Sequence, residues 1–558
     1  MPPTRSRILL WSAASGACWA LAWPGIGGVT AFAFVAWLPL LQAERLHQQR
    51  TGGQRAFVPY AMLGLFLWNL SCSWWFWCVS TPWPTKLLSV AAPVLVNTLL
   101  MSLPWLLKRW SFKRAGETAS QVIFLTAWLA LERLHHDWDL QWPWLSLGNV
   151  FGTRPAWVQW YDHTGMLGGS LWLLLVNLFA FRAIRNASGA FIYRLRKMLP
   201  SLALLIAPLL LSYAMWTAPR HAEGPSYHVV VVQPNIDPYE QKFAGAPMDQ
   251  LEDMLRLADA AMPDSTALVV FPETALQEGA TVDLMHGELA FNGLWENDLE
   301  ASRSVRRLRA FQATHPSAAL LCGMSSDRLL KGDEVQRSTA RPLGDGKNFY
   351  ESYNAAVWLP AKGAMEVYHK SKLVAGVELM PFEEVLGPLG DLALDLGGTT
   401  GSLGQQEKRS VLTDAATALK VVPVICYESV FPEHVAAHVR NGGNLIAIIT
   451  NDAWWGNSPG HVQHLAFASL RAIETRRWVV RSANTGISCA IDPKGELVQR
   501  STWWIPTALA CSVRSSEHIT FFVAHGDLIG RAALVMLPLL LVVIGVRSRR
   551  IQRTDQEG

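Results

Sequence analysis

Hydrophobic residues in this 558-residue chain are concentrated before residue 217 and after residue 520, and the part between them is mixed. A helix needs about 20 apolar residues to cross the roughly 30 Å core of a bilayer. Five runs are near that length: residues 56–79, 87–107, 164–181, 198–216 and 521–546. Three shorter runs are residues 8–22, 29–41 and 121–134. By length alone these three are spans or re-entrant segments, and the first is also compatible with a signal peptide.

Connections rich in lysine and arginine alternate with connections that have almost none. They are found at the N-terminus, in residues 44–55, 108–116 and 182–197, and after residue 546, whereas the other connections have almost none. Basic connections favour the cytoplasmic side of a membrane. All of them fall on that side if all eight runs cross, so we expect eight spans with both termini in the cytoplasm. Cleavage of the first run would leave seven spans, which argues against a signal peptide.

This topology places residues 218–519 outside the cytoplasmic membrane, in the periplasm where a cell has two membranes. Within this part, short apolar runs typical of buried strands alternate with helical patterns. The expected strands are residues 228–232, 267–271, 318–322, 355–359, 421–425 and 445–449. The expected helices are residues 248–261, 298–314 and 461–477. Repeated strand and helix order predicts an α/β layered fold.

The chain is therefore divided into four regions. These are a seven-span bundle (1–217), a catalytic domain (218–519), a last span (520–546) and a basic cytoplasmic tail (547–558). Two stretches of the second region, residues 325–353 and 384–416, are rich in glycine, serine and charge. We expect them to be mobile surface insertions that act as lids over a site.

Three reactive side chains stand where an expected strand meets a loop. Glu273 follows residues 267–271, Lys370 follows residues 365–369, and Cys426 follows the apolar run that ends at Ile425. A thiol reacts as thiolate, so it needs a base to take its proton and a positive neighbour. Glu273 and Lys370 supply these two needs. The lysine and the backbone N–H of Tyr427 would also stabilise an oxyanion formed when the thiol attacks a carbonyl.

Each of these residues also has a simpler interpretation when taken alone. Cys426 could be a small buried hydrophobe, Glu273 a helix cap and Lys370 a solvated surface charge. Their order and their common position at strand ends favour the catalytic interpretation.

A glutamate, then Tyr-x-Lys, then Cys-Tyr-Glu, each at a strand end, resembles the carbon–nitrogen hydrolase (nitrilase) superfamily. Further blocks are similar to its apolipoprotein N-acyltransferase branch: Gln233-Pro-Asn-Ile, Asn451-Asp-Ala-Trp-Trp-Gly, Arg471-Ala-Ile-Glu and Arg481-Ser-Ala-Asn-Thr-Gly. The similarity covers most of residues 226–515 and, more loosely, the membrane part. It implies an α-β-β-α sandwich for the catalytic domain.

The resemblance also implies supporting residues. It assigns Glu378, Tyr427 and Glu428 to the surroundings of the triad, and it suggests Phe243 and Trp454 for substrate binding. The sequence departs from the family at residues 373–377, which read Leu-Val-Ala-Gly-Val where the family has Leu-Val-Pro-Phe-Gly, and at Gly460-His461, which replaces Gly-Pro.

A catalytic domain outside the cytoplasm has no access to ATP or acyl-CoA, so the expected acyl donor is a membrane phospholipid. The expected reaction forms a Cys426 thioester and a lysophospholipid. By resemblance, the acceptor is the α-amine of the diacylglyceryl-cysteine that begins an apolipoprotein. We expect no cofactor, no metal and no nucleic-acid partner, and we expect a monomer. No spacing predicts a zinc site, although His461 and His464 stand three apart.

Two other classes remain open at this point. One is a membrane-tethered amidase of the nitrilase type, in which water resolves the acyl-enzyme. The other is a membrane scaffold or lipid transporter without catalysis, which would tolerate loss of the triad.

Seven cysteines, three of them in membrane runs, do not predict a disulfide framework. Tryptophans near the outer end of the third and fourth spans predict an aromatic belt facing lipid: Trp68, Trp74, Trp75, Trp77 and Trp83.

Overall fold

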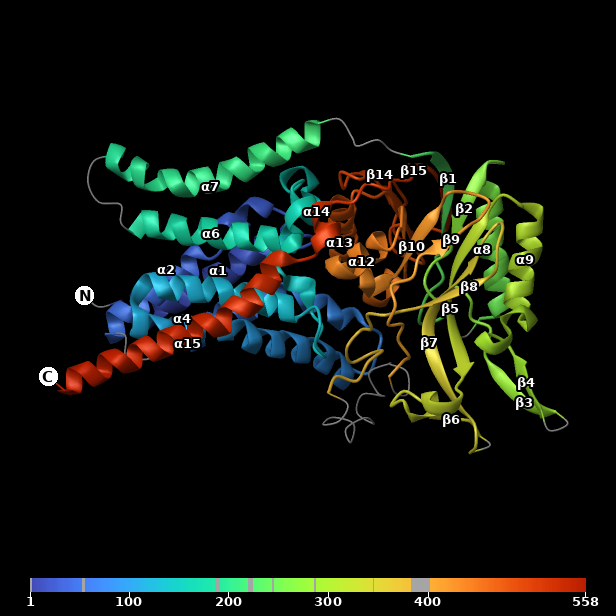
Figure 1. The fold of residues 1–558 in the computed structure, drawn as a ribbon, viewed down its shortest axis with the longest axis horizontal. Helices are drawn as coiled ribbons and strands as arrows, with labels where there is room; N and C mark the ends of the chain where they lie inside the picture. The colour runs from blue at the N-terminus through green and yellow to red at the C-terminus, as the bar shows by residue number, and fades with distance from the viewer. Residues whose placement is uncertain are drawn as a thin grey trace. The chain divides into compact units, whose positions relative to one another are not determined.

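The structure is a computed structural model, and it has two compact units (Figure 1). It describes residues 3–52, 56–185, 191–218, 224–242, 245–285, 288–344, 346–382 and 402–557. The first unit comprises residues 1–77, 86–218 and 525–558, and the second comprises residues 78–85 and 219–524.

The first unit is helical. Its main helices are α1 (Arg5–Ala22), α2 (Leu38–Thr51), α3 (Val58–Ser73), α4 (Trp83–Leu134), α6 (Met166–Arg185), α7 (Phe191–Thr217) and α15 (Leu528–Glu557). Among the described residues, four helical segments are long and apolar enough to cross a membrane. They lie in α4, α6, α7 and α15.

Two of the predicted spans share one of these helices. Helix α4 is 52 residues long and contains both residues 87–107 and residues 121–134. It is broken at Gly116, whose φ of 79° is open to glycine because glycine has no Cβ. Residues 29–41 do not form one helix, since a 3₁₀ turn (Thr30–Phe34) precedes the start of α2. The count of eight spans therefore stays a prediction.

Small residues bring α1 and α3 into close contact. A Cβ on Gly16 would lie 2.5 Å from the Gly64 carbonyl oxygen, so the helices can approach only because both positions are glycine. Trp19 stacks on Trp68 beside this contact, with ring centroids 4.8 Å apart.

The predicted aromatic belt is only partly observed. Trp68 and Trp75 are fully buried inside the first unit, whereas Trp74, Trp77 and Trp83 are exposed. Trp75 donates its indole N–H to the Cys72 carbonyl. The belt prediction is wrong for the two buried tryptophans, because their rings pack against other aromatic side chains such as Trp19 and Phe76.

The second unit contains two large β-sheets. The first has the order β15-β1-β2-β5-β7-β6, with β8 also paired to β7, and the second has the order β14-β13-β12-β11-β10-β9. The first sheet consists of β1 (Ser226–Gln233), β2 (Thr266–Val270), β5 (Ala319–Leu329), β6 (Arg341–Pro342), β7 (Phe349–Leu359), β8 (Glu366–His369) and β15 (Thr507–Arg514). The second consists of β9 (Leu412–Thr413), β10 (Lys420–Ile425), β11 (Leu445–Thr450), β12 (Val479–Ala483), β13 (Cys489–Ile491) and β14 (Leu497–Arg500).

The hydrophobic contacts show how these layers stack. Val229 and Val231 of β1 pack against residues of the second sheet, so the two sheets lie face to face. The alternate residues Val230 and Val232 pack under α8 (Pro247–Ala261) and α9 (Arg303–Thr314). The outer face of the second sheet packs under α12 (Pro432–Arg440) and α13 (Pro459–Thr475) in the same way. The unit is thus an α-β-β-α sandwich (Figure 1).

Continuous apolar strands follow from this stacking. A strand in an inner sheet is buried on both faces, so every position of its central part must be apolar. This is why residues 229–232 and 421–425 read as unbroken hydrophobic runs, and why the six expected strands all correspond to observed ones.

The prediction of an irregular insertion at residues 325–353 is wrong at both ends of that stretch. Strands β5 and β7 continue into it as an antiparallel ladder that pairs Ser325 with Asn354 and Leu329 with Tyr350. Charged residues there had suggested a loop, but they are satisfied by one another: Arg337 bonds Glu351 at 2.9 Å across the hairpin.

Part of the other expected lid, residues 384–401, lies outside the described residues. The described remainder includes the buried Leu403 and the short strand β9, which pairs with β10. The expected helix at residues 298–314 begins later than predicted. Ser302 caps α9 by accepting the Val305 N–H at 3.1 Å, and a 3₁₀ segment precedes it.

Candidate active site

The three reactive side chains each follow a strand, as the sequence predicts. Glu273 lies three residues after β2, Lys370 directly follows β8, and Cys426 directly follows β10. Cys426 has a φ of 50°, and Thr274, next to Glu273, has a φ of 45°. Non-glycine residues rarely adopt this left-handed conformation, and such strain is concentrated at functional sites.

Glu273 is buried, and both of its carboxylate oxygens are hydrogen-bonded. Oε1 accepts from Lys370 Nζ at 3.2 Å and from Asn354 Nδ2 at 2.8 Å. Oε2 accepts the backbone N–H of Asn451 at 3.1 Å. These donors come from β7, from the end of β8 and from the end of β11, so the carboxylate is fixed by both sheets.

Lys370 lies between two carboxylates. Its Nζ donates to Glu273 and, at 2.9 Å, to Glu378 Oε1. Asn354 also donates to both, since its Nδ2 lies 2.8 Å from Glu378 Oε1. Burial lowers the pKa of Lys370, but the charges of Glu378 and Glu273 outweigh burial and hold it above its usual value. The side chain is therefore an ammonium at neutral pH.

Cys426 is buried, with 8% of its surface exposed. Burial raises the pKa of its thiol, the Glu273 carboxylate raises it further, and Lys370 opposes this only in part. The thiol is therefore protonated in the resting protein. A reaction at this sulfur needs a base that takes the proton as the sulfur attacks, and Glu273 is the carboxylate whose charge acts most strongly on the sulfur.

Glu428 connects the loops that carry Lys370 and Cys426. Its Oε2 accepts the Ile425 N–H at 2.7 Å, and its Oε1 accepts the Ser371 N–H at 2.6 Å. Burial raises the pKa of Glu428, but His434 and these backbone donors hold it at about 2. The carboxylate stays charged and fixes Lys370 and Cys426 relative to each other.

The structure describes two of the three remaining expected residues, Tyr427 and Trp454. The Tyr427 ring packs edge-on against Phe431, with centroids 5.1 Å apart. Trp454 is half-buried against Tyr239, whose hydroxyl donates to the Trp454 carbonyl at 2.9 Å. Phe243 lies outside the described residues.

Sequence reasoning missed a second lysine at this site. Lys242 is buried, and its Nζ donates to the Glu273 carbonyl at 3.0 Å and to the Thr274 hydroxyl. Burial lowers the pKa of Lys242 to about 8, although the charges of Glu273 and Cys426 oppose this shift. Lys242 follows a polar stretch, so nothing in the local pattern distinguished it from a surface lysine. Asn354 gave a weak signal, as a polar residue at the head of an apolar run.

A histidine contacts the backbone of Cys426. His464 Nε2 is 3.1 Å from the Cys426 carbonyl and 2.8 Å from Ser429 Oγ. Its Nδ1 is 3.0 Å from Asp452, which also accepts from Arg481 at 2.7 Å. Nε2 therefore contacts the strained Cys426 backbone, and Nδ1 fixes the ring against Asp452.

Replacing Lys242 with methionine is expected to slow any reaction at Cys426 by about tenfold or more, because the change removes a donor that holds the Glu273 segment and small misplacements of reacting groups are costly. The free energy of unfolding, measured over a series of pH values, checks that Lys242 is buried. The pKa of Lys242 is lowered from 10.5 in the unfolded chain to about 8 in the folded one, so the folded state binds this proton less tightly. The wild-type protein should therefore gain stability between pH 8 and 10.5, and the variant should lack that gain. An identical pH dependence in both would contradict the buried position.

Known proteins resemble both parts of this chain. Residues 229–516 match the family model described as carbon-nitrogen hydrolase, and residues 15–179 match the apolipoprotein N-acyltransferase N-terminal domain. The apolipoprotein N-acyltransferase of Chlorobaculum tepidum is 28% identical over 94% of this chain and 94% of its own length. That of Azotobacter vinelandii is 29% identical over 86% of this chain and 87% of its own length.

The solved structure of Saccharomyces cerevisiae Nit3, a member of branch 10 of the nitrilase superfamily, is 15% identical. The match covers 53% of this chain and 93% of the Nit3 chain, with a TM-score of 0.37. The carbon-nitrogen hydrolase match begins in β1 and ends after β15, so it spans the whole sandwich and contains Glu273, Lys370 and Cys426. This chain belongs to the carbon–nitrogen hydrolase family and, within it, to the apolipoprotein N-acyltransferase branch.

Proposed function

We propose that this protein transfers a fatty acyl chain from a membrane phospholipid, through a Cys426 thioester, to the N-terminal amine of diacylglyceryl-cysteine in apolipoproteins. The observation that carries the proposal is the buried Lys370 ammonium held between Glu273 and Glu378, within electrostatic reach of the Cys426 sulfur. The names of the relatives that align along nearly the whole chain support the acceptor.

In the first half-reaction Glu273 takes the proton from Cys426 as the sulfur attacks the ester carbonyl carbon of the phospholipid. Lys370 and the Tyr427 backbone N–H hold the oxyanion of the tetrahedral intermediate. The intermediate collapses to a thioester, and the departing glycerol oxygen takes the proton from Glu273. A lysophospholipid leaves.

In the second half-reaction the free amine of the apolipoprotein attacks the thioester carbon. Glu273 accepts a proton from the attacking amine, and the same two donors hold the second oxyanion. Collapse forms the amide bond and expels the Cys426 sulfur, which recovers the proton from Glu273. Glu273 thus acts as base and then as acid in each half-reaction.

The proposal includes a position in the membrane. We propose eight spans in the bacterial cytoplasmic membrane, with both termini in the cytoplasm and residues 218–519 on the outer side. The four long apolar helical segments and the basic residues at alternate connections support this arrangement.

Alkaline phosphatase is active only outside the cytoplasm, so fusions report this topology. A fusion after Arg553 is expected to be inactive, and a fusion after Ala218 is expected to be active. Activity of the enzyme fused after Arg553 would overturn the eight-span model.

A lipopeptide acceptor separates the transferase from a hydrolase. A transferase must keep water from its thioester, so the acyl-enzyme is expected to persist for long periods in phospholipid vesicles alone. A diacylated lipopeptide with a free N-terminal amine should discharge it to an N-acyl product with ping-pong kinetics. The N-acetylated lipopeptide is the matched control and should leave it intact. Rapid release of free fatty acid that the lipopeptide does not change would favour the amidase class instead.

A further inference from the structure

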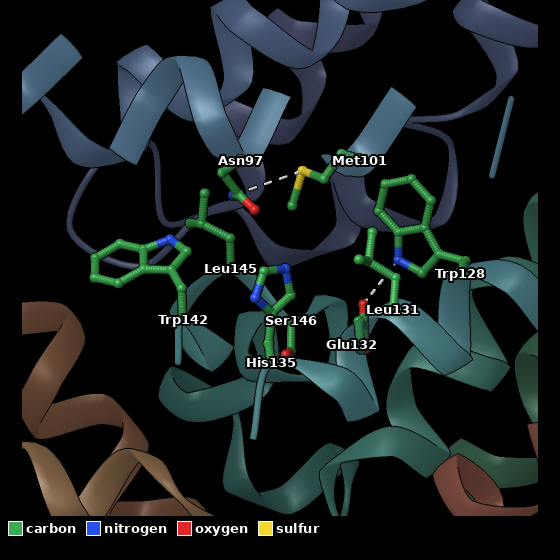
Figure 2. Close-up of a pocket in the computed structure, with 9 residues that line it drawn as sticks. All are labelled: Asn97, Met101, Trp128, Leu131, Glu132, His135, Trp142, Leu145 and Ser146. Atoms are coloured by element: carbon green, nitrogen blue, oxygen red, sulfur yellow. Dashed lines mark hydrogen bonds between the residues drawn. The ribbon is translucent and has the colours of Figure 1, made fainter. Parts of the chain in front are cut away.

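A small cavity lies inside the first unit, between α4 and the segment that follows it (Figure 2). It has room for a group about the size of one water molecule. Apolar side chains such as Leu131 and Leu145 form part of its wall. Four polar side chains also line it: Asn97, Glu132, His135 and Ser146.

Glu132 is nearly fully buried, with 4% of its surface exposed, and the Ser170 hydroxyl lies near its carboxylate. Oε1 accepts the Trp128 indole N–H at 2.8 Å and the Leu147 N–H at 2.9 Å. Oε2 is buried and has no hydrogen-bond partner. Since a buried polar atom without a partner is costly, this oxygen points to something that binds there.

His135 and Asn97 also offer unpaired acceptors. His135 Nδ1 lies 3.2 Å from the Leu140 carbonyl, so in the neutral ring Nδ1 carries the proton and Nε2 is an acceptor. Asn97 uses its amide nitrogen to donate to Asn69 Oδ1 at 2.6 Å. His135 Nε2 and Asn97 Oδ1 are both buried and without a partner. The cavity therefore has three unpaired acceptors from three side chains.

The Glu132 carboxylate also lacks a cationic partner among the described residues. None of the described lysines and arginines has a recorded ion pair with Glu132. A second carboxylate, Asp527, adds to the negative field at Glu132, and its recorded cation is Arg133 at 3.7 Å. An unpaired carboxylate inside a membrane protein is expensive and is usually matched to a partner.

We propose that this cavity binds a primary ammonium group. Its three N–H donors match the three unpaired acceptors, and its charge neutralises Glu132. Water supplies only two donors and no charge, and a quaternary ammonium has no N–H donor. The ammonium can belong to the headgroup of an aminophospholipid or to a free small amine. This site does not depend on the acyl-transfer proposal, since none of its residues belongs to the triad.

Thermal unfolding of the full chain in detergent tests the proposal, with methylammonium as the probe and tetramethylammonium at the same ionic strength as its control. Methylammonium is expected to raise the Tm saturably by about 2–4 °C, because a ligand stabilises the state that binds it. Tetramethylammonium should not. The Glu132→Gln variant should lose the response, whereas Glu117→Gln, a charge change elsewhere on α4, should keep it.

A second variant keeps the test decisive if Glu132→Gln fails to fold. His135→Phe removes one acceptor at similar size and is expected to weaken the response to methylammonium at least tenfold in apparent affinity. Equal effects of both cations on the wild-type protein, or a full response in either variant, would overturn the proposal.

Lipid nanodiscs distinguish the two sources of the ammonium group. If the headgroup of phosphatidylethanolamine occupies the cavity, the wild-type protein should be more stable in that lipid than in phosphatidylcholine, and Glu132→Gln should remove the difference. If the lipids act equally while methylammonium still binds selectively, the ligand is a free amine. Both results support an ammonium site, and the absence of selectivity in both measurements refutes it.

Discussion

Replacement of Cys426 by alanine is expected to abolish acyl-enzyme formation completely. The thioester requires the sulfur, and no other side chain described at the site can form it. After exposure to phospholipid vesicles, intact mass of the wild-type protein should show a fatty-acyl adduct, and the variant should show none. Alanine also removes little volume, so the variant should fold.

Two other cysteines of the catalytic unit are the controls. Cys322 and Cys489 are fully buried in the hydrophobic layers, and burial raises the pKa of both thiols. Alanine at either position should lower stability by about 1 kcal/mol or more through lost packing and leave the adduct unchanged. An adduct that survives at Cys426→Ala but disappears at Cys322→Ala would show that the nucleophile is assigned wrongly.

Replacement of Lys370 by methionine is expected to have the second largest effect. The change removes a charged oxyanion donor, which is worth about 10²–10³ in rate in other enzymes. It also leaves the Glu273 and Glu378 carboxylates, both of which accept from Lys370, without their shared cation. The rate of thioester formation, measured by single-turnover mass spectrometry, should fall by at least that factor.

Lys372 offers a matched control two residues further along the chain. Its ammonium lies 5.1 Å from the centroid of the Phe431 ring. Lys372→Met should change the rate of thioester formation by less than about fivefold, since a cation–π contact is worth about 0.5–1 kcal/mol. A similar loss in both variants would show that the effect comes from general charge rather than from the position of Lys370.

The fold of the catalytic unit was largely predictable from the hydrophobic pattern. Strands buried on both faces must be apolar throughout, so residues 228–232, 421–425 and 445–449 stood out against their polar neighbours. The end of each apolar run marked the place where a side chain such as Cys426 can reach a site. The pattern failed at residues 325–353, because charges that pair across a long hairpin look like a loop in sequence.

Residues that complete the site were harder to predict. Lys242 and Asn354 contact Glu273 from segments 31 and 81 residues away along the chain. Neither residue stands at the end of an apolar run. The sequence around a lysine does not show whether its ammonium is buried and hydrogen-bonded or lies in solvent. Their role depends on which segments the two sheets bring together.

The sequence by itself determined that apolar helices flank an α/β domain, and that a carboxylate, an amine and a thiol each follow a strand. These features are local, because they depend on the period of burial within one element and on where that period ends. Only the tertiary structure decided that Lys370 lies between Glu273 and Glu378, that Lys242 is buried, and that Glu132 has an unpaired oxygen inside a cavity. Burial and the distance between charges are properties of packing between distant segments, and no local pattern encodes them.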